Sequence, residues 1–183
     1  MAELYIIPEC FIDTNCIETL VPTVQGYNHQ KGCNTVVKIM QEKLKDNFAI
    51  GIIDKDKKQV KYVDDFDEIV HTESLYLYKH PLKPHFLIMI YPAMDSFILK
   101  CASETNIKME DFGLPSDLKS FTKRTKQVTS KEDATFKKLF NAIKQAKEIM
   151  ILKNWIKYLK QKQYGADCEE LKKMVSEQQL NSY

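Results

Sequence analysis

The run Phe48-Ala49-Ile50-Gly51-Ile52-Ile53 leads directly into the acidic sequence Asp54-Lys55-Asp56-Lys57. An unbroken apolar run of this length is typical of a parallel strand that is covered on both faces, so we predict a central buried strand here. A second apolar run, Ile6-Ile7-Pro8, ends in Glu9. Because strand side chains alternate between faces, Asp54 and Asp56 are expected to point to one side and Lys55 to the other.

The acidic residues that follow these two strands predict a divalent-metal site. If the strand before Glu9 lies beside the strand before Asp54, the carboxylates of Glu9, Asp54 and Asp56 converge where the backbone leaves the sheet. Carboxylate oxygens are hard donors of the kind that Mg2+ and Mn2+ prefer, often together with a substrate phosphate. An Asp-x-Asp pattern alone is common because Asp also ends strands and starts turns, and Glu9 makes the interpretation more specific.

With these motifs, the chain resembles the Toprim domain, the catalytic module of topoisomerases, primases and nucleases of the overcoming-lysogenization-defect type. That family has a Glu after its first strand and an Asp-x-Asp after a later one, which Glu9 and Asp54 with Asp56 match. The segment 32–38 is similar to the stretch that opens the helix before Asp-x-Asp in some defence-associated members. The resemblance covers residues 3 to about 105.

The resemblance implies an α/β fold with a Toprim-like, mainly parallel sheet flanked by helices. It also implies a nuclease that hydrolyses phosphodiester bonds of DNA or RNA with Mg2+ or Mn2+, as an effector of anti-phage defence with an ATPase partner or as a homo-oligomer. The residues that it assigns to metal binding are Glu9, Asp54, Asp56 and Asp95, and those that it assigns to catalysis are Glu9, Asp54, Asp56 and Lys57.

Two other interpretations stay open. The segment 11–15, which reads Phe-Ile-Asp-Thr-Asn, also resembles the end of the first strand of PIN-domain ribonucleases, in which Asp13 is the leading ligand and Glu42 and Asp95 are later partners. Glu9 interrupts the apolar run before Asp13, which favours the Toprim-like interpretation. The third possibility is a catalytically inactive Toprim-like subunit that senses or docks, and activity with metal separates it from the other two.

Charge is distributed unevenly along the chain. Residues 1–117 contain 12 basic and 18 acidic residues, whereas residues 118–162 contain 13 Lys or Arg and only 3 acidic residues. A basic stripe on helices is typical of a protein that binds a phosphate backbone, although a solvated helix face has the same composition. The candidate contacts to nucleic acid are Lys31, Lys123, Arg124, Lys126 and Lys131.

The chain of 183 residues is long enough for one domain with an appendage. We predict a metal-binding α/β domain over residues 1–113 and a basic helical extension, packed on that domain, over residues 114–183. Within the extension, Ser130 and Asp133 are expected to cap one long helix. Its apolar residues recur on one face at Phe136, Leu139, Phe140, Ile143 and Met150, and continue at Trp155, Ile156 and Leu159.

Composition points to a protein of the cytoplasm with no membrane partner. The longest apolar stretch has only the length of a strand and contains a Pro. The first apolar segment carries Glu3 and Glu9, unlike a signal peptide. The five cysteines are odd in number and have no Cys-x-x-Cys spacing, which predicts reduced thiols.

Overall fold

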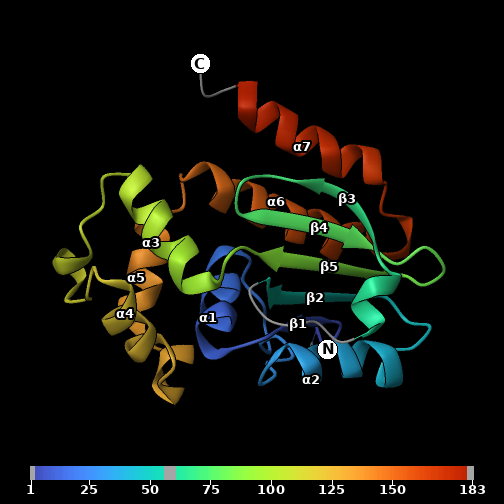
Figure 1. Cartoon of the computed structure of the whole chain (residues 1–183), viewed down its shortest axis with the longest axis horizontal. Coiled ribbons are helices and arrows are strands. Elements are labelled where there is room, and N and C mark those ends of the chain that lie inside the picture. Colours follow the sequence, from blue (N-terminus) through green and yellow to red (C-terminus); the bar gives the residue numbers. More distant parts are fainter. Residues whose placement is uncertain (1–2, 56–60, 181–183) are drawn as a thin grey trace.

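The computed structural model describes residues 3–55 and 61–180 (Figure 1). Its strands are β1 (Ile6–Pro8), β2 (Ala49–Asp54), β3 (Asp67–His71), β4 (Leu75–Lys79) and β5 (His85–Ile90). Its α-helices are α1 (Phe11–Leu20), α2 (Cys33–Lys38), α3 (Met94–Glu104), α4 (Leu118–Thr125), α5 (Ala134–Ala142), α6 (Lys147–Lys162) and α7 (Cys168–Leu180). A π-helix (Ile39–Lys43) continues α2, and 3-10 turns cover Lys61–Asp65, Met109–Phe112, Val128–Lys131 and Gln163–Gly165.

The five strands form one mixed sheet in the order β1-β2-β5-β4-β3. Strands β1, β2 and β5 are parallel, whereas β4 and β3 are antiparallel to their neighbours. The expected α/β class is therefore confirmed, and β1 and β2 are parallel neighbours, which is the condition for the predicted convergence of Glu9 and Asp54. The central strand is β5 and not β2, because the hairpin of β3 and β4 adds two strands beyond β5.

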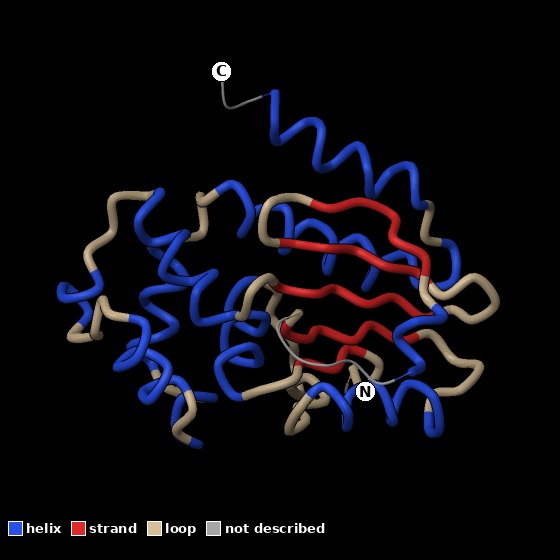
Figure 2. Tube along the Cα trace, viewed as in Figure 1, coloured by secondary structure: helices blue, strands red, loops and turns tan. Residues whose placement is uncertain are grey.

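Helices cover both faces of the sheet, so two apolar cores result (Figure 2). On one face the strands pack against α1, α3 and the helices from α4 onward, through buried residues that include Ile50, Ile88 and Trp155. On the other face they pack against α2 and the π-helix, through Ile53 and Met40 among others. Residues of successive strand positions belong to alternate cores, as the two-residue period of a strand requires.

Gly51 allows α2 and the π-helix to lie close to β2. A Cβ atom at this position would lie 2.7 Å from the Sδ atom of Met40 and 2.7 Å from a methyl carbon of Leu87. Distances this short are well inside van der Waals contact, so a larger residue would push the helix away from the strand. The strand that ends in Asp54 is thereby packed tightly against the helical layer on one face of the sheet.

The C-terminal part of the chain is helical beyond Gly113, as expected, but the long helix predicted after Asp133 is two helices. Asp133 is the N-cap of α5, where its side chain accepts a hydrogen bond from the Thr135 N–H at 2.8 Å. The chain then turns between Ile143 and Ala146, both of which are buried. Apolar spacing does not distinguish one long helix from two helices that meet at a buried turn.

The apolar core runs without a break from the sheet into the helices beyond residue 113. In Figure 1 the helices α3, α4 and α5 gather beyond the carboxyl ends of β2 and β5, while α6 passes behind the strands. Helix α7 is held to α6 by a hydrogen bond of 3.1 Å from the Trp155 indole N–H to the Leu171 carbonyl. The helical extension therefore shares its core with the sheet, and the division at residue 113 stays a prediction.

Candidate functional site

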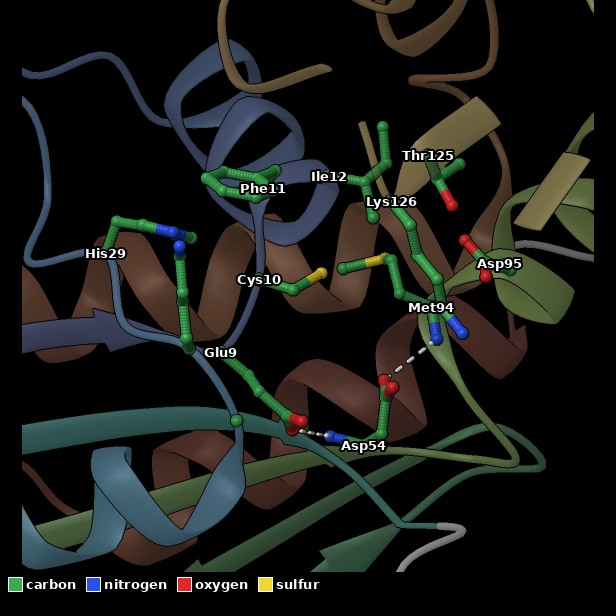
Figure 3. A pocket seen from close by; sticks show the side chains of 12 residues that line it. Glu9, Cys10, Phe11, Ile12, His29, Asp54, Met94, Asp95, Thr125 and Lys126 are labelled. Carbon is green, nitrogen blue, oxygen red and sulfur yellow. Dashed lines mark hydrogen bonds between the residues drawn. The ribbon is translucent and has the colours of Figure 1, made fainter. Parts of the chain in front are cut away.

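Three acidic residues lie at the edge where the parallel strands end. Glu9 follows β1, Asp54 is the last residue of β2, and Asp95 lies in the first turn of α3, just after β5. The backbone N–H of Asp54 donates a hydrogen bond of 2.9 Å to Oε2 of Glu9, and the N–H of Met94 donates one of 3.0 Å to Oδ1 of Asp54 (Figure 3). The fold thus brings together Glu9, Asp54 and Asp95.

A fourth carboxylate, that of Asp13, enters the same cluster from α1. Its side chain is only 1% exposed, and among the residues that the structure describes its Oδ1 atom has no hydrogen-bond partner. Burial raises the pKa of Asp13 well above its ordinary value, and the negative charges of Asp54, Glu9 and Asp95 raise it further. These mutual effects place four carboxylates within electrostatic reach of one another.

Three of the four carboxylates, those of Glu9, Asp54 and Asp95, border a cavity of about 260 Å³. Its other walls are apolar or basic, and Figure 3 shows Phe11 and Ile12 on one side, Glu9 and Asp54 on the other, and Lys126 beside Asp95. The lining residues are Glu9, Cys10, Phe11, Ile12, His29, Lys31, Gly32, Asp54, Met94, Asp95, Thr125 and Lys126. The cavity therefore combines carboxylates, ammonium groups and an apolar wall.

The segment that follows α1 carries His29 and Lys31 into this cavity. It runs along β1, because the N–H of Asn28 donates to the Ile6 carbonyl at 3.0 Å and the N–H of Gln30 donates to the Pro8 carbonyl at 3.0 Å. Residues 29 and 31 thus fall on the same side of the segment and both line the cavity. This loop therefore lies at the carboxylate edge of the sheet.

The predicted basic contacts divide into different environments. Lys126, at the end of α4, lines the cavity, and Lys123 is exposed on α4. Lys131 lies close enough to His29 to lower the pKa of that imidazole. Arg124 is engaged internally: it forms an ion pair with Asp133, and its guanidinium lies 5.1 Å from the ring centroid of Phe136.

The predicted site residues that remain are Asp56, Lys57 and Glu42. Asp56 and Lys57 are outside the described residues. Glu42, a partner in the PIN-like interpretation, is an exposed residue of the π-helix that faces Lys38 at 4.0 Å, and it does not line the cavity. Cys10 does line the cavity, but burial, followed by the charge of Asp13, raises the pKa of its thiol, so it is not an activated nucleophile.

The sequence interpretation missed Asp13 as a member of the Glu9 and Asp54 cluster. The available signal was the row Asp13-Thr14-Asn15, three polar residues inside an apolar helix, all of which are buried. Thr14 contacts His29 and Asn15 contacts the segment before α5, so each of the three polar side chains holds a different part of the site.

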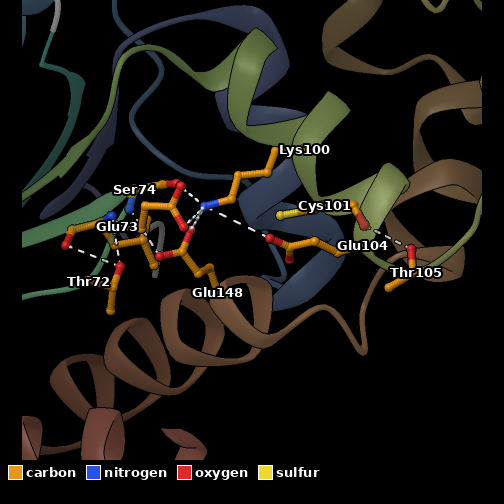
Figure 4. A network of polar contacts seen from close by, with 9 residues as sticks. Thr72, Glu73, Ser74, Lys100, Cys101, Glu104, Thr105 and Glu148 are labelled. Carbon is orange, nitrogen blue, oxygen red and sulfur yellow. Dashed lines mark hydrogen bonds and ion pairs between the residues drawn. The ribbon is translucent and has the colours of Figure 1, made fainter. Parts of the chain in front are cut away.

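A second polar cluster lies beside this edge and has a structural role. The Lys100 ammonium contacts Glu148 at 3.2 Å, Glu73 at 2.9 Å and the Ser74 hydroxyl at 2.9 Å (Figure 4). Glu148 also accepts a hydrogen bond of 3.0 Å from the Ser74 N–H. These contacts tie α3 and α6 to the turn between β3 and β4.

Among the described residues, no three His, Cys, Asp or Glu side chains are arranged as a ready metal site. Comparison of the chain with protein-family models, curated proteins and solved structures finds no match. Within the ranges 3–55 and 61–180, none of the helices has the length and apolar character needed to span a bilayer. The function of the chain must therefore be inferred from the geometry of the cavity.

Proposed function

We propose that the protein is a divalent-metal-dependent nuclease with a Toprim-like catalytic site. The observation that carries this proposal is the convergence of Glu9, Asp13, Asp54 and Asp95 where three parallel strands end. Such a cluster of like charges is unfavourable unless protons or cations neutralise it. A metal ion that binds a phosphodiester is the neutralising partner that this combination of carboxylates and lysines fits best.

The donor set suits Mg2+ or Mn2+. Carboxylate oxygens are the ligands that both ions prefer, and the Oδ1 atoms of Asp13 and Asp95 are buried without a hydrogen-bond partner among the described residues. We assign metal binding to Glu9, Asp54 and Asp95 with Asp13 in support, and we retain Asp56 and Lys57 as predicted participants. When bound, the ion supplies a water of lowered pKa and stabilises charge on the phosphate.

The chain itself orients the reacting groups. The backbone N–H groups of Asp54 and Met94 hold the carboxylates of Glu9 and Asp54 in fixed positions. Lys31 and Lys126, which line the cavity, supply positive charge toward a phosphate.

The order of elements supports the Toprim-like class over the PIN-like alternative. Glu9 and Asp54 lie at the ends of adjacent parallel strands, which is the arrangement that the Toprim-like interpretation requires. The PIN-like interpretation needs Glu42, which lies outside the cavity. We further propose that the protein acts in the cytoplasm, since all five cysteines are free thiols, and in defence with an ATPase partner or as a homo-oligomer.

Cleavage assays with labelled DNA and RNA test this proposal. We expect cutting with Mg2+ or Mn2+ and none with EDTA. Glu9→Gln and Asp54→Asn should each slow cleavage by at least about 100-fold. Loss of a group that only supports a metal ligand costs roughly 10–100-fold, so loss of a ligand itself should cost at least as much. Both variants should stay folded, because neutralising one carboxylate relieves repulsion.

Asp111→Asn is the matched control, because Asp111 is an exposed carboxylate in the 3-10 turn Met109–Phe112. It should cut at the wild-type rate. If Asp54→Asn also cuts at that rate, the site assignment is wrong. If the wild-type protein cuts no substrate with either ion, alone or with its partner, the inactive docking or sensing subunit becomes the better description.

A further inference from the structure

The cavity has an aromatic side that phosphate chemistry does not require. The rings of Phe11 and His29 are stacked, with centroids 4.6 Å apart and an interplanar angle of 21°. Both residues line the cavity, together with the apolar side chains of Ile12 and Met94 (Figure 3). A site that held only a metal ion and a phosphate would gain nothing from this wall, whereas a flat, apolar group would bury it favourably.

The protonation state of His29 is determined by its neighbours. The single hydroxyl proton of Thr14 is donated to the Cys10 carbonyl at 2.7 Å. We assign the proton of the neutral ring to Nδ1, which then donates to Thr14 Oγ1 at 2.9 Å. Burial, followed by the charge of Lys131 and then that of Lys31, lowers the pKa of His29, so that the ring is neutral at pH 7.

It follows that Nε2 of His29 carries a lone pair. This atom is buried, and among the described residues it has no hydrogen-bond partner. A buried acceptor without a donor is costly, and a ligand that brings an N–H group would satisfy it. Amino groups such as N6 of adenine and N4 of cytosine are donors of this kind.

We propose that the cavity binds one unstacked nucleobase of a single-stranded nucleic acid, which lies beside the His29 ring in its plane and against Phe11, with an amino group donating to His29 Nε2. This inference rests on the proposed function, whose substrate it narrows to single strands or strand ends. A volume of about 260 Å³ lies near the lower end of the range of small-molecule sites, which begins at roughly 300 Å³. It is therefore a space for one nucleotide unit and not for a stacked base pair.

The charges agree with this orientation. Lys31 lies 5.7 Å from the Phe11 ring centroid, so a base that contacts Phe11 has its own phosphate within reach of an ammonium group. Glu9 and Asp54 lie on the opposite side of the cavity from Phe11 (Figure 3). Proteins that combine aromatic and basic groups in this way usually bind single strands whose unstacked bases contact the aromatic rings.

Fluorescence anisotropy with three labelled probes tests the inference. The probes are a short oligodeoxyadenylate, the same strand in a duplex with oligodeoxythymidylate, and an abasic sugar-phosphate strand of equal length. The protein carries Asp54→Asn and Mg2+ is present, so binding is measured apart from cleavage. Asn keeps the oxygen that accepts the Met94 N–H. We expect the adenylate strand to bind about 5- to 100-fold more tightly than the abasic strand or the duplex, as stacking of one base predicts.

Two substitutions locate the effect. Phe11→Leu keeps an apolar side chain and removes the ring, and His29→Phe keeps a stacked ring and removes the acceptor. Each should reduce affinity for the adenylate strand several-fold and leave the abasic strand unchanged. His71→Phe is the control, because His71 is also stacked, on Tyr76 at 5.1 Å, but does not line the cavity. Thermal unfolding of each variant verifies that it is folded.

The inference is overturned if the wild-type cavity binds abasic and adenylate strands equally, if it binds neither, or if both substitutions leave the difference intact. These outcomes are separate from those of the proposed function. A protein that prefers unstacked bases but never cuts contradicts only the nuclease proposal. A protein that cuts but does not distinguish abasic from normal strands contradicts only the nucleobase subsite.

Discussion

At the scale of single residues, His85 shows how burial can determine the protonation state of an imidazole. It begins β5, at the edge of the sheet opposite the carboxylates, and its side chain is fully buried. Its Nδ1 atom shares a hydrogen bond of 2.6 Å with the Tyr62 hydroxyl. Burial lowers its pKa from 6.5 to about 4, so the folded protein holds this imidazole neutral through the physiological range.

This shift predicts how stability depends on pH. Between pH 6.5 and about 4 the unfolded chain protonates His85 and the folded chain does not, so the unfolded state binds more protons. The free energy of unfolding should therefore fall as the pH drops through this window, by up to about 3 kcal/mol from this group, and this contribution should be constant above it. Urea unfolding at a series of pH values measures the slope.

His85→Gln should flatten that slope, even though the variant is less stable at neutral pH. His71→Gln provides the comparison, because His71 is exposed on β3. A His85→Gln variant with the wild-type slope would show that other groups cause the acid sensitivity. His80, whose pKa burial also lowers, contributes with the same sign and accounts for some remaining slope.

Residues of the site differ in how far the sequence could predict them. Glu9 and Asp54 were predictable, because each ends an apolar run and parallel strands end at the same edge. Asp13 was not assigned to them, because its proximity depends on the tertiary packing of α1. The role of His29 depends on a hydrogen bond with Thr14 and a stacked ring, neither of which has a pattern in the sequence.

At the scale of elements, α1 joins the sheet to the helical part of the chain through Asn15. The amide of Asn15 donates to the carbonyls of Ser130 at 2.8 Å and Asp133 at 3.2 Å, and its oxygen accepts from the Thr19 hydroxyl at 3.2 Å. The amide nitrogen of Asn15 thus bonds to the segment before α5, and its oxygen bonds within α1. The basic segment between α4 and α5 is thereby fixed above the cavity.

Asn15→Ala should therefore destabilise the protein by about 1–3 kcal/mol, because the buried Ser130 carbonyl loses its donor and the partly buried Asp133 carbonyl is left with the Lys137 N–H. The free energy of unfolding from urea denaturation measures this loss. Asn141→Ala is the matched control, since the Asn141 amide is exposed and bonds only within α5, to the Lys137 carbonyl at 2.9 Å. Its effect should stay within about 0.5 kcal/mol. Equal effects of the two changes would show that the hydrogen bonds from Asn15 to the segment before α5 do not contribute measurably to stability.

Elements with strong periodicity were predictable, and those that depend on tertiary contacts were not. The strand before Asp54 and the hairpin of β4 and β5 follow from apolar runs and from the turn with Pro81 and Pro84. Strand β3 was missed because Asp67 and Glu68 make it polar, and it is mostly exposed at the edge of the sheet. The division of α5 from α6 reflects packing at a buried turn.

At the scale of the whole molecule, charge is segregated between an acidic sheet domain and a basic helical part. Residues 118–162 contain 13 basic and 3 acidic residues, and this stretch includes α4 and the turn beside the cavity. Arg124 is tied to Asp133, so the cations that face solvent near the site are lysines. A nucleic acid that enters the cavity would pass this surface.

Replacing Lys123, Lys126 and Lys131 with Gln should therefore weaken binding of all single strands about equally. Each phosphate contact that is lost removes the release of one counterion, which changes the slope of log affinity against log salt by about 0.7. Anisotropy titrations at several salt concentrations should show a slope that is smaller by about 2. The preference for a normal over an abasic strand should remain, because it comes from Phe11 and His29.

A control with the same change in net charge decides whether position matters. Lys157, Lys172 and Lys173 lie on α6 and α7, and the last two are paired with Glu169 and Glu170. Figure 1 shows α7 on the opposite side of the molecule from α4. Their replacement with Gln should leave the slope nearly unchanged, because exposed charges separated by more than about 10 Å are largely screened. If both triple variants reduce the slope equally, binding follows total charge and the α4 surface has no special part in it.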